Sequence, residues 1–267
     1  MGSNGPGSNG PVKITVLGSG TSMGVPTIGC RCAVCLSTDP RDKRLRASIL
    51  ISYGGRNIVI DTTPDFRTQV LRANVDRLDA IIFTHAHADH IMGLDDVRPF
   101  NFHQKIRIPI YAAADTLTTL MTVFGYVFDG LQHRTSIPQL DVNILGGGPF
   151  ELFGLSFQPI RLWHGKSPIF GFRFGNAAYL TDHSEIPEES MTQLAGLDVL
   201  FLDALRHMPH PTHSTVECSV TNAQKLRTKR AFFTHISHDL GHGKTESALP
   251  ENVRLAYDGL ELYVDQR

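Results

Sequence analysis

Residues 80–90 read AIIFTHAHADH and place three histidines and an aspartate directly after a continuous apolar run. The apolar run is typical of a fully buried β-strand, so the donors fall in the loop where that strand ends. In a turn, side chains at alternate positions converge, so His85 and His87 can bind one ion while Asp89 and His90 face a neighbouring position. Imidazole together with carboxylate favours zinc, manganese or iron over magnesium or calcium. The loop therefore begins two metal sites, and each needs ligands from elsewhere.

Candidate partners follow three later apolar runs. His164 ends PIRLWH, Asp182 ends AAYLTD and His235 ends AFFTH. Taken singly, a histidine at a strand end is more often exposed or hydrogen-bonded, and a Thr–Asp pair more often belongs to a turn or a helix cap. Three such residues beside one donor-rich loop favour a shared metal centre. The segment AFFTHISH also repeats the run from an apolar strand through Thr–His that opens the loop.

Strand-like segments outnumber helical ones. We expect strands within residues 12–20, 79–85, 106–113, 150–164, 169–182, 198–205, 230–237 and 260–264, and a hairpin over 47–62 that turns at Gly54–Gly55. Helices are predicted over 64–75, 115–128 and 215–227. Strands in hairpins and meanders exclude a doubly wound βαβ sheet and favour two mixed sheets covered by helices, in one domain.

Composition narrows the class of protein. The 267 residues carry 25 Lys and Arg against 26 Asp and Glu, which argues against binding nucleic acid by phosphate neutralisation. No run of 18 apolar residues occurs, so no membrane-spanning helix is expected. Residues 1–10, MGSNGPGSNG, contain nothing that could pack and are expected to be a disordered leader or a cloning remnant. The folded domain is then expected over residues 11–267.

The order of these motifs is similar to that of a known superfamily. THAHADH fits the H-x-H-x-D-H signature of the metallo-β-lactamase superfamily, and NIVIDTTPDFR, WHG, YLTD and FTHISH occur in the order that this superfamily uses. The resemblance extends over about residues 12–265 and is strongest to the PhnP-like phosphodiesterase branch. It implies an α+β fold, an αββα sandwich of two mixed sheets with the site on one rim.

The resemblance also implies roles for individual residues. His85, His87 and His164 would bind one divalent metal, Asp89, His90 and His235 a second, and Asp182 would bridge the two. The metals would be manganese, zinc or iron, sharing a bridging hydroxide that attacks phosphorus. Asp89 would also orient or deprotonate that nucleophile. His213, in RHMPHPTHSTVE and 22 residues before His235, matches the general acid of the branch; His207 and His210 are the next candidates.

Three of the four cysteines form a second cluster. Cys30, Cys32 and Cys35 are spaced C-x-C-x-x-C, too close for a disulfide framework, which favours a structural zinc in a reducing compartment, the cytoplasm by default. Cys218 or a histidine could supply the fourth ligand. In the PhnP-like branch the matching residue is His238, and we adopt it, leaving Cys218 as an ordinary core thiol.

The remaining histidines and cations have less clear roles. His103, His133, His183 and His242 are expected to be mostly solvated, and Arg98, Arg173 and Lys166 are candidates for binding a substrate phosphate.

The functional hypothesis is a dinuclear metal-dependent phosphodiesterase acting on a small cyclic or nucleotide-like phosphodiester. The alternatives are a PqqB-like protein of cofactor biosynthesis and a lactonase or thioester hydrolase on the same scaffold. A tRNA 3′-processing nuclease is less favoured because no basic arm is visible, and a non-catalytic metal-binding module is the remaining alternative. Relatives often pair, so the resemblance also implies a homodimer.

Overall fold

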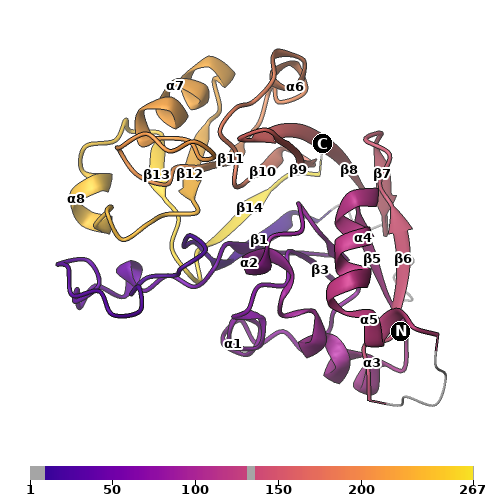
Figure 1. Ribbon diagram of the computed structural model, residues 1–267. Helices are drawn as coiled ribbons and strands as arrows, with labels where there is room; N and C mark the ends of the chain where they lie inside the picture. Colours follow the sequence, from indigo (N-terminus) through magenta and orange to yellow (C-terminus); the bar gives the residue numbers. More distant parts are fainter. Residues whose placement is uncertain (1–9, 131–135, 267) are drawn as a thin grey trace, which may run out of the picture.

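The computed structural model describes residues 10–130 and 136–266, which form two seven-stranded sheets packed face to face (Figure 1). The first sheet has the order β14-β1-β2-β3-β4-β5-β6 and the second β13-β12-β11-β10-β9-β8-β7. The strands of the first sheet are β1 Val12–Gly18, β2 Ser48–Tyr53, β3 Arg56–Ile60, β4 Ala80–Ile82, β5 Ile108–Ala112, β6 Leu140–Ile144 and β14 Glu261–Val264. Those of the second are β7 Phe150–Leu152, β8 Leu155–His164, β9 Ser167–Phe174, β10 Ala177–Leu180, β11 Val199–Asp203, β12 Arg230–Thr234 and β13 Val253–Leu255.

Helices cover the outer face of each sheet. They are α1 Phe66–Arg72, α2 Ala88–Ile91, α3 Arg98–Gln104, α4 Ala114–Val123, α5 Gly125–Phe128, α6 Glu188–Thr192, α7 Val216–Leu226 and α8 His242–Glu246, with 3-10 turns at Pro40–Asp42 and Leu94–Val97. The core accordingly has three layers. One lies between the sheets and includes Ile49, Phe157 and Phe172; the other two lie between each sheet and its own helices. This is the predicted αββα sandwich.

Each sheet joins an antiparallel half to a parallel half. Strands β3 to β6 run parallel in the first sheet, and β10 to β13 run parallel in the second. The two similar segments noted in the sequence are β4 and β12, and each lies between two parallel neighbours. The carboxyl ends of parallel strands are where α/β proteins place ligand sites, and here both sheets contribute such ends.

Most predicted elements are confirmed. The hairpin of β2 and β3 turns at Gly54–Gly55, and the three predicted helices correspond to α1, to α4 with α5, and to α7. The strand expected over 79–85 is confined to the three residues of β4, although the amide of Phe83 still donates to the carbonyl oxygen of Tyr111 on β5. The short strands β6 and β13 were not predicted.

The remaining predictions concern the N-terminal leader, His133 and membrane-spanning helices. Of the expected leader, residues 1–9 lie outside the described residues, as does His133. Within the described ranges, no helix combines the length and apolarity needed to cross a membrane.

Candidate metal centre

The donors of the THAHADH loop and the three distant strand ends converge on the rim between the sheets. One group brings together His85, His87, His164 and Asp182; another brings together Asp89, His90, His235 and Asp182. Within each group the candidate ligand atoms all lie within 4.8 Å of one another. Asp182 belongs to both groups, as expected for a bridging carboxylate.

Three residues at this centre adopt strained backbone conformations. Asp61, Asp182 and His235 each follow a strand and adopt positive φ values of 67°, 57° and 57°. Such conformations are strained for residues other than glycine and accumulate at functional sites, where the surrounding structure enforces them. Gly93, just after the loop, packs directly on the β3–α1 connection: a Cβ there would lie 2.1 Å from the carbonyl oxygen of Thr63. The loop therefore approaches the sheet as closely as only glycine allows.

Hydrogen bonds donated by Nδ1 leave Nε2 of three candidate ligand histidines free. His90 Nδ1 donates to Asp61 Oδ2 at 2.7 Å, His164 Nδ1 to the carbonyl oxygen of Asp182 at 2.6 Å, and His85 Nδ1 to Thr84 Oγ1 at 3.0 Å. In a neutral imidazole the nitrogen that does not donate carries the lone pair, so these bonds fix the tautomer that a metal requires.

Asp61 organises two of these histidines at once. Its carboxylate accepts from His90 Nδ1 and also from the hydroxyl of Thr84, at 2.8 Å, and Thr84 in turn contacts His85. Asp61 is fully buried, and burial raises its pKa while His90 opposes that shift. The sequence motif NIVIDTTPDFR contains this residue, but the sequence assigned it no role.

The donor set fits a pair of divalent cations. Asp182 Oδ2 lies 3.2 Å from Nε2 of both His90 and His235, and Asp89 Oδ2 lies 3.3 and 3.6 Å from the same two nitrogens. Ligands about 2.1 Å from a tetrahedral ion are separated by roughly 3.4 Å. The nitrogens are buried, yet among the described residues neither forms a hydrogen bond with correct geometry. Lone pairs facing one another in this way need a positive charge between them.

The titration of the centre leads to the same conclusion. Burial opposes a charge on His235, but Asp182 and Asp89 raise its pKa to about 9. Burial likewise opposes a charge on His90, whose pKa the carboxylates Asp182, Asp89 and Asp61 nevertheless raise well above its usual value. The carboxylates thus attract a proton to positions where a metal ion would compensate the same charge.

His213 lies over this centre and is held by a buried carboxylate. Its ring stacks on His235 with centroids 4.6 Å apart and meets the ring of His164 at 4.7 Å. Its Nδ1 donates to Asp203 Oδ2 at 2.7 Å, which leaves Nε2 available. Burial and His235 lower the pKa of His213 to about 4. Asp203 was missed from the sequence, although it also ends an apolar run, DVLFLD, and that signal could have identified it.

The cysteine cluster forms around His238, three residues after His235. Nδ1 of His238 lies 3.2, 3.6 and 3.5 Å from the sulfurs of Cys30, Cys32 and Cys35. A tetrahedral zinc bound by thiolate and imidazole separates sulfur from nitrogen by about 3.5 Å, so the four residues suit one ion. The backbone amide of Cys35 lowers the pKa of Cys32 to about 6, despite an opposing desolvation effect.

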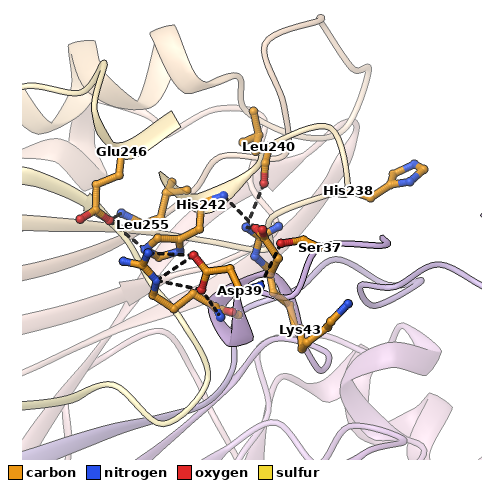
Figure 2. Close-up of polar contacts among 12 residues, drawn as sticks. Ser37, Asp39, Lys43, His238, Leu240, His242, Glu246 and Leu255 are labelled. Atoms are coloured by element: carbon orange, nitrogen blue, oxygen red, sulfur yellow. Dashed lines mark hydrogen bonds and ion pairs between the residues drawn. The ribbon is translucent and has the colours of Figure 1, made fainter. Parts of the chain in front are cut away.

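A buried ion pair joins the cysteine loop to the segment that bears His235 and His238. The guanidinium of Arg44 binds Asp42 at 2.9 Å and donates to the carbonyl oxygens of Ser237 and Leu240 at 3.2 and 2.9 Å. Asp42 also accepts from the backbone amide of His242 at 2.8 Å. Figure 2 shows the polar contacts in this region. The Arg44–Asp42 pair is thus a second link, which needs no metal, between the cysteine loop and the segment that bears His235 and His238.

Several other predictions about side chains are corrected or narrowed. Cys218 is exposed on α7 and is not a core thiol. His183 and His242 are buried; His183 Nδ1 donates to the carbonyl oxygen of Leu180, and His242 pairs with Glu246 at 3.0 Å. These two were expected to be solvated, and that prediction is wrong, because each ring is enclosed in the fold with a polar partner. His103 is exposed as expected.

Of the alternative acids, only His210 lies beside His213, and two of the candidate phosphate-binding cations are engaged elsewhere. His207 is exposed and pairs with Glu217 at 2.6 Å, whereas the ring of His210 lies 5.0 Å from that of His213. Arg98 and Arg173 donate to backbone carbonyl oxygens. Within the described part of the chain, neither of them nor Lys166 lines the cavities beside the centre.

Comparison with known proteins agrees with this architecture. The family model described as a beta-lactamase superfamily domain matches residues 56–236. A crystal structure described as a new diphosphatase from the PhnP family is 53% identical, with a TM-score of 0.90 over 96% of this chain and 98% of that one. The chain therefore belongs to the metallo-β-lactamase superfamily. Within it, the protein is a metal-dependent hydrolase of the PhnP-like group.

Two other similar proteins are named for different functions. Coenzyme PQQ synthesis protein B of Methylorubrum populi is 32% identical over 225 residues, 72% of each chain. An octanoyltransferase of Porphyromonas gingivalis is 37% identical over 260 residues, 96% of this chain and 52% of that protein. The chain thus spans about half the length of this second relative.

Proposed function

We propose that the protein is a dinuclear metal-dependent phosphodiesterase that hydrolyses a P–O bond in a small cyclic or nucleotide-like substrate, including disubstituted diphosphates. The observation that carries the proposal is the position of Asp182 in both donor groups, with His213 packed beside them. A bridging carboxylate holds two cations close enough to act on one phosphoryl group. The similar diphosphatase of the PhnP family supports the same class of bond.

In this proposal the metal ligands are those of the two groups. His85, His87 and His164 would hold one ion and Asp89, His90 and His235 the other, and Asp182, which belongs to both groups, would be shared. When bound, two divalent ions of zinc, manganese or iron supply a water of lowered pKa and neutralise charge on the phosphoryl oxygens. The rim provides the imidazole and carboxylate donors that such ions prefer.

His213 is the proposed general acid. Its Nδ1 donates to Asp203, so Nε2 is the atom that would pass a proton to the departing oxygen. The pKa of about 4 would leave the ring neutral at neutral pH, but an anionic phosphodiester bound beside it favours the protonated ring. Asp89, whose carboxylate lies 3.6 Å from His235 and is partly exposed, is the proposed group that would orient the attacking water.

Cys30, Cys32, Cys35 and His238 are proposed to hold a structural zinc. The cluster is closed, because four protein ligands leave no position for a substrate. Its function would be to attach the N-terminal loop to the segment that carries His235.

A panel of substrates tests the proposed activity. The metal-loaded protein is assayed with bis-p-nitrophenyl phosphate, a 2′,3′-cyclic nucleotide, a disubstituted diphosphate, a lactone and an octanoyl thioester, with His213→Ala in parallel. We expect turnover of at least one phosphorus substrate and a loss of roughly 100-fold or more in the variant, within the range of general acid catalysis. Turnover confined to the lactone or the thioester would overturn the proposal, and metal uptake without any turnover would indicate a binding module.

A further inference from the structure

Two adjoining cavities open beside the metal centre. One, of about 300 Å³, is lined by the candidate ligands His85, His87 and His164. The other, of about 550 Å³, extends from Thr84 to Arg161 and Glu189. Both are lined by Asp115, Thr116, Pro168 and Ile169, so the two cavities adjoin and together make up a hollow beside the centre. Ligand pockets usually have volumes of roughly 300–1,000 Å³, so the hollow can hold a substituent of the scissile phosphate.

The floor of the larger cavity is fixed to the metal centre. The backbone amide of Phe170 on β9 donates to the carbonyl oxygen of Thr84 at 3.2 Å, and Thr84 immediately precedes His85. The Phe170 ring is partly exposed, and it lines the larger cavity together with Gly147. The larger cavity therefore offers an aromatic ring to a planar group.

Arg161 offers a second planar surface. Its guanidinium lies 4.8 Å from the centre of the Trp163 ring. Among the described residues its guanidinium forms no hydrogen bond or ion pair, unlike the engaged guanidinium of Arg173. An unpaired, stacked guanidinium is a surface on which planar rings bind well.

The charges that line the larger cavity argue against an additional phosphate there. The exposed carboxylates of Asp115 and Glu189 line this cavity together with one guanidinium, that of Arg161, so the lining is net negative. A neutral group with hydroxyl or amino donors suits carboxylate acceptors, whereas a second anion would be repelled by them.

We propose that this cavity is a subsite for the nucleoside part of the substrate, with Phe170 and Arg161 contacting the base and Asp115 and Glu189 accepting hydrogen bonds from its donors. The inference rests on the proposed function, because it takes the phosphate to be bound at the metal centre. It specifies the substrate as a nucleotide, which the donor groups alone do not.

Calorimetric titration tests the subsite without relying on turnover. AMP, ribose 5-phosphate and methyl phosphate share one phosphate monoester and differ only in the group that would enter the cavity. For the metal-loaded full chain we expect the Kd to rise in that order, by at least tenfold from AMP to methyl phosphate. Arg161→Ala should weaken AMP roughly 5- to 100-fold, the range for losing one stacking contact with a base, and leave methyl phosphate within twofold.

Two further variants complete the design. Phe170→Ala should act in the same way as Arg161→Ala, and Arg230→Ala, at the amino end of β12, should change neither Kd. The proposal is overturned by AMP binding no more tightly than methyl phosphate, or by Arg161→Ala and Phe170→Ala weakening both ligands equally. If no phosphorus substrate is turned over but this binding order holds, the proposed phosphodiesterase activity is wrong and the proposed subsite stands.

Discussion

The His/Asp centre and the cysteine cluster lie only three residues apart, at His235 and His238, yet they are built in different ways. Donors of the first come from strand ends in both sheets, and buried hydrogen bonds orient their rings. Three donors of the second come from one irregular loop, whose internal contacts are amides directed at sulfur, such as Cys35 N to Cys32 Sγ at 3.4 Å. The two sheets therefore position the donors of the first site, whereas the cysteine donors of the second lie in a loop outside the strands.

The largest expected effect is at the shared carboxylate of the first site. Asp182→Asn should remove the charge common to both donor groups, lower the metal content by up to two ions and reduce hydrolysis by more than about 100-fold, beyond the usual loss for an outer partner. Metal analysis by mass spectrometry, together with the phosphodiesterase assay, measures both. Asp141→Asn, in an exposed ion pair with Arg107, serves as the control. Full metal content in Asp182→Asn would contradict the assignment.

The second largest effect is expected at the buried ion pair of Arg44 with Asp42, which links the cysteine loop to the segment that bears His235. Arg44→Met leaves Asp42 buried without its counter-charge, and we expect a loss of about 3–5 kcal/mol in the free energy of unfolding. Arg41→Met removes the exposed pair with Asp39 on the same loop and should cost no more than about 1 kcal/mol. Urea unfolding of both variants with zinc present gives the comparison. Equal losses would show that Arg44 adds nothing specific.

The cysteine cluster should contribute stability and not chemistry. Cys32→Ser is expected to lower the metal content by one ion and the Tm by about 5–10 °C, corresponding to roughly 2–3 kcal/mol for a domain of this size. Activity at low temperature should persist. Cys218→Ser, at an exposed thiol, should change neither quantity. A Cys32→Ser protein with unaltered Tm and metal content would remove the structural zinc from the account.

The smallest expected effect concerns the residue that orients the histidines. Asp61→Asn keeps the shape but weakens the hold on His90 Nδ1, so metal affinity should fall roughly 10- to 100-fold. Competition with a fluorescent chelator measures that affinity. The comparison with Cys32→Ser is informative: Asp61→Asn should leave the sulfur-bound ion in place. Loss of all ions together would mean that the two sites are not built independently.

The sequence predicted the parts of the site that have a local signal. The loop at 84–90 crowds donors into one turn, and His164, Asp182 and His235 each end an apolar run, so their meeting at a sheet edge could be predicted. Asp203 has the same pattern and was missed because its role is to hold His213, a contact that exists only after folding.

Other features depend on contacts that no local pattern encodes. Arg44 looks like any charged loop residue, and its burial results from segments about 190 residues away. The exposure of Cys218 likewise depends on which face of α7 meets the sheet. The short strands β6 and β13 depend on neighbouring strands for their pairing.

The most direct measurement of the central claim is anomalous X-ray scattering from crystals of the metal-loaded protein, recorded at the absorption edges of zinc, manganese and iron. The account predicts two peaks on the rim, one among His85, His87 and His164 and the other among Asp89, His90 and His235, with Asp182 touching both, and a third peak among the cysteines and His238. A single peak on the rim, or Asp182 turned away from it, would contradict the account.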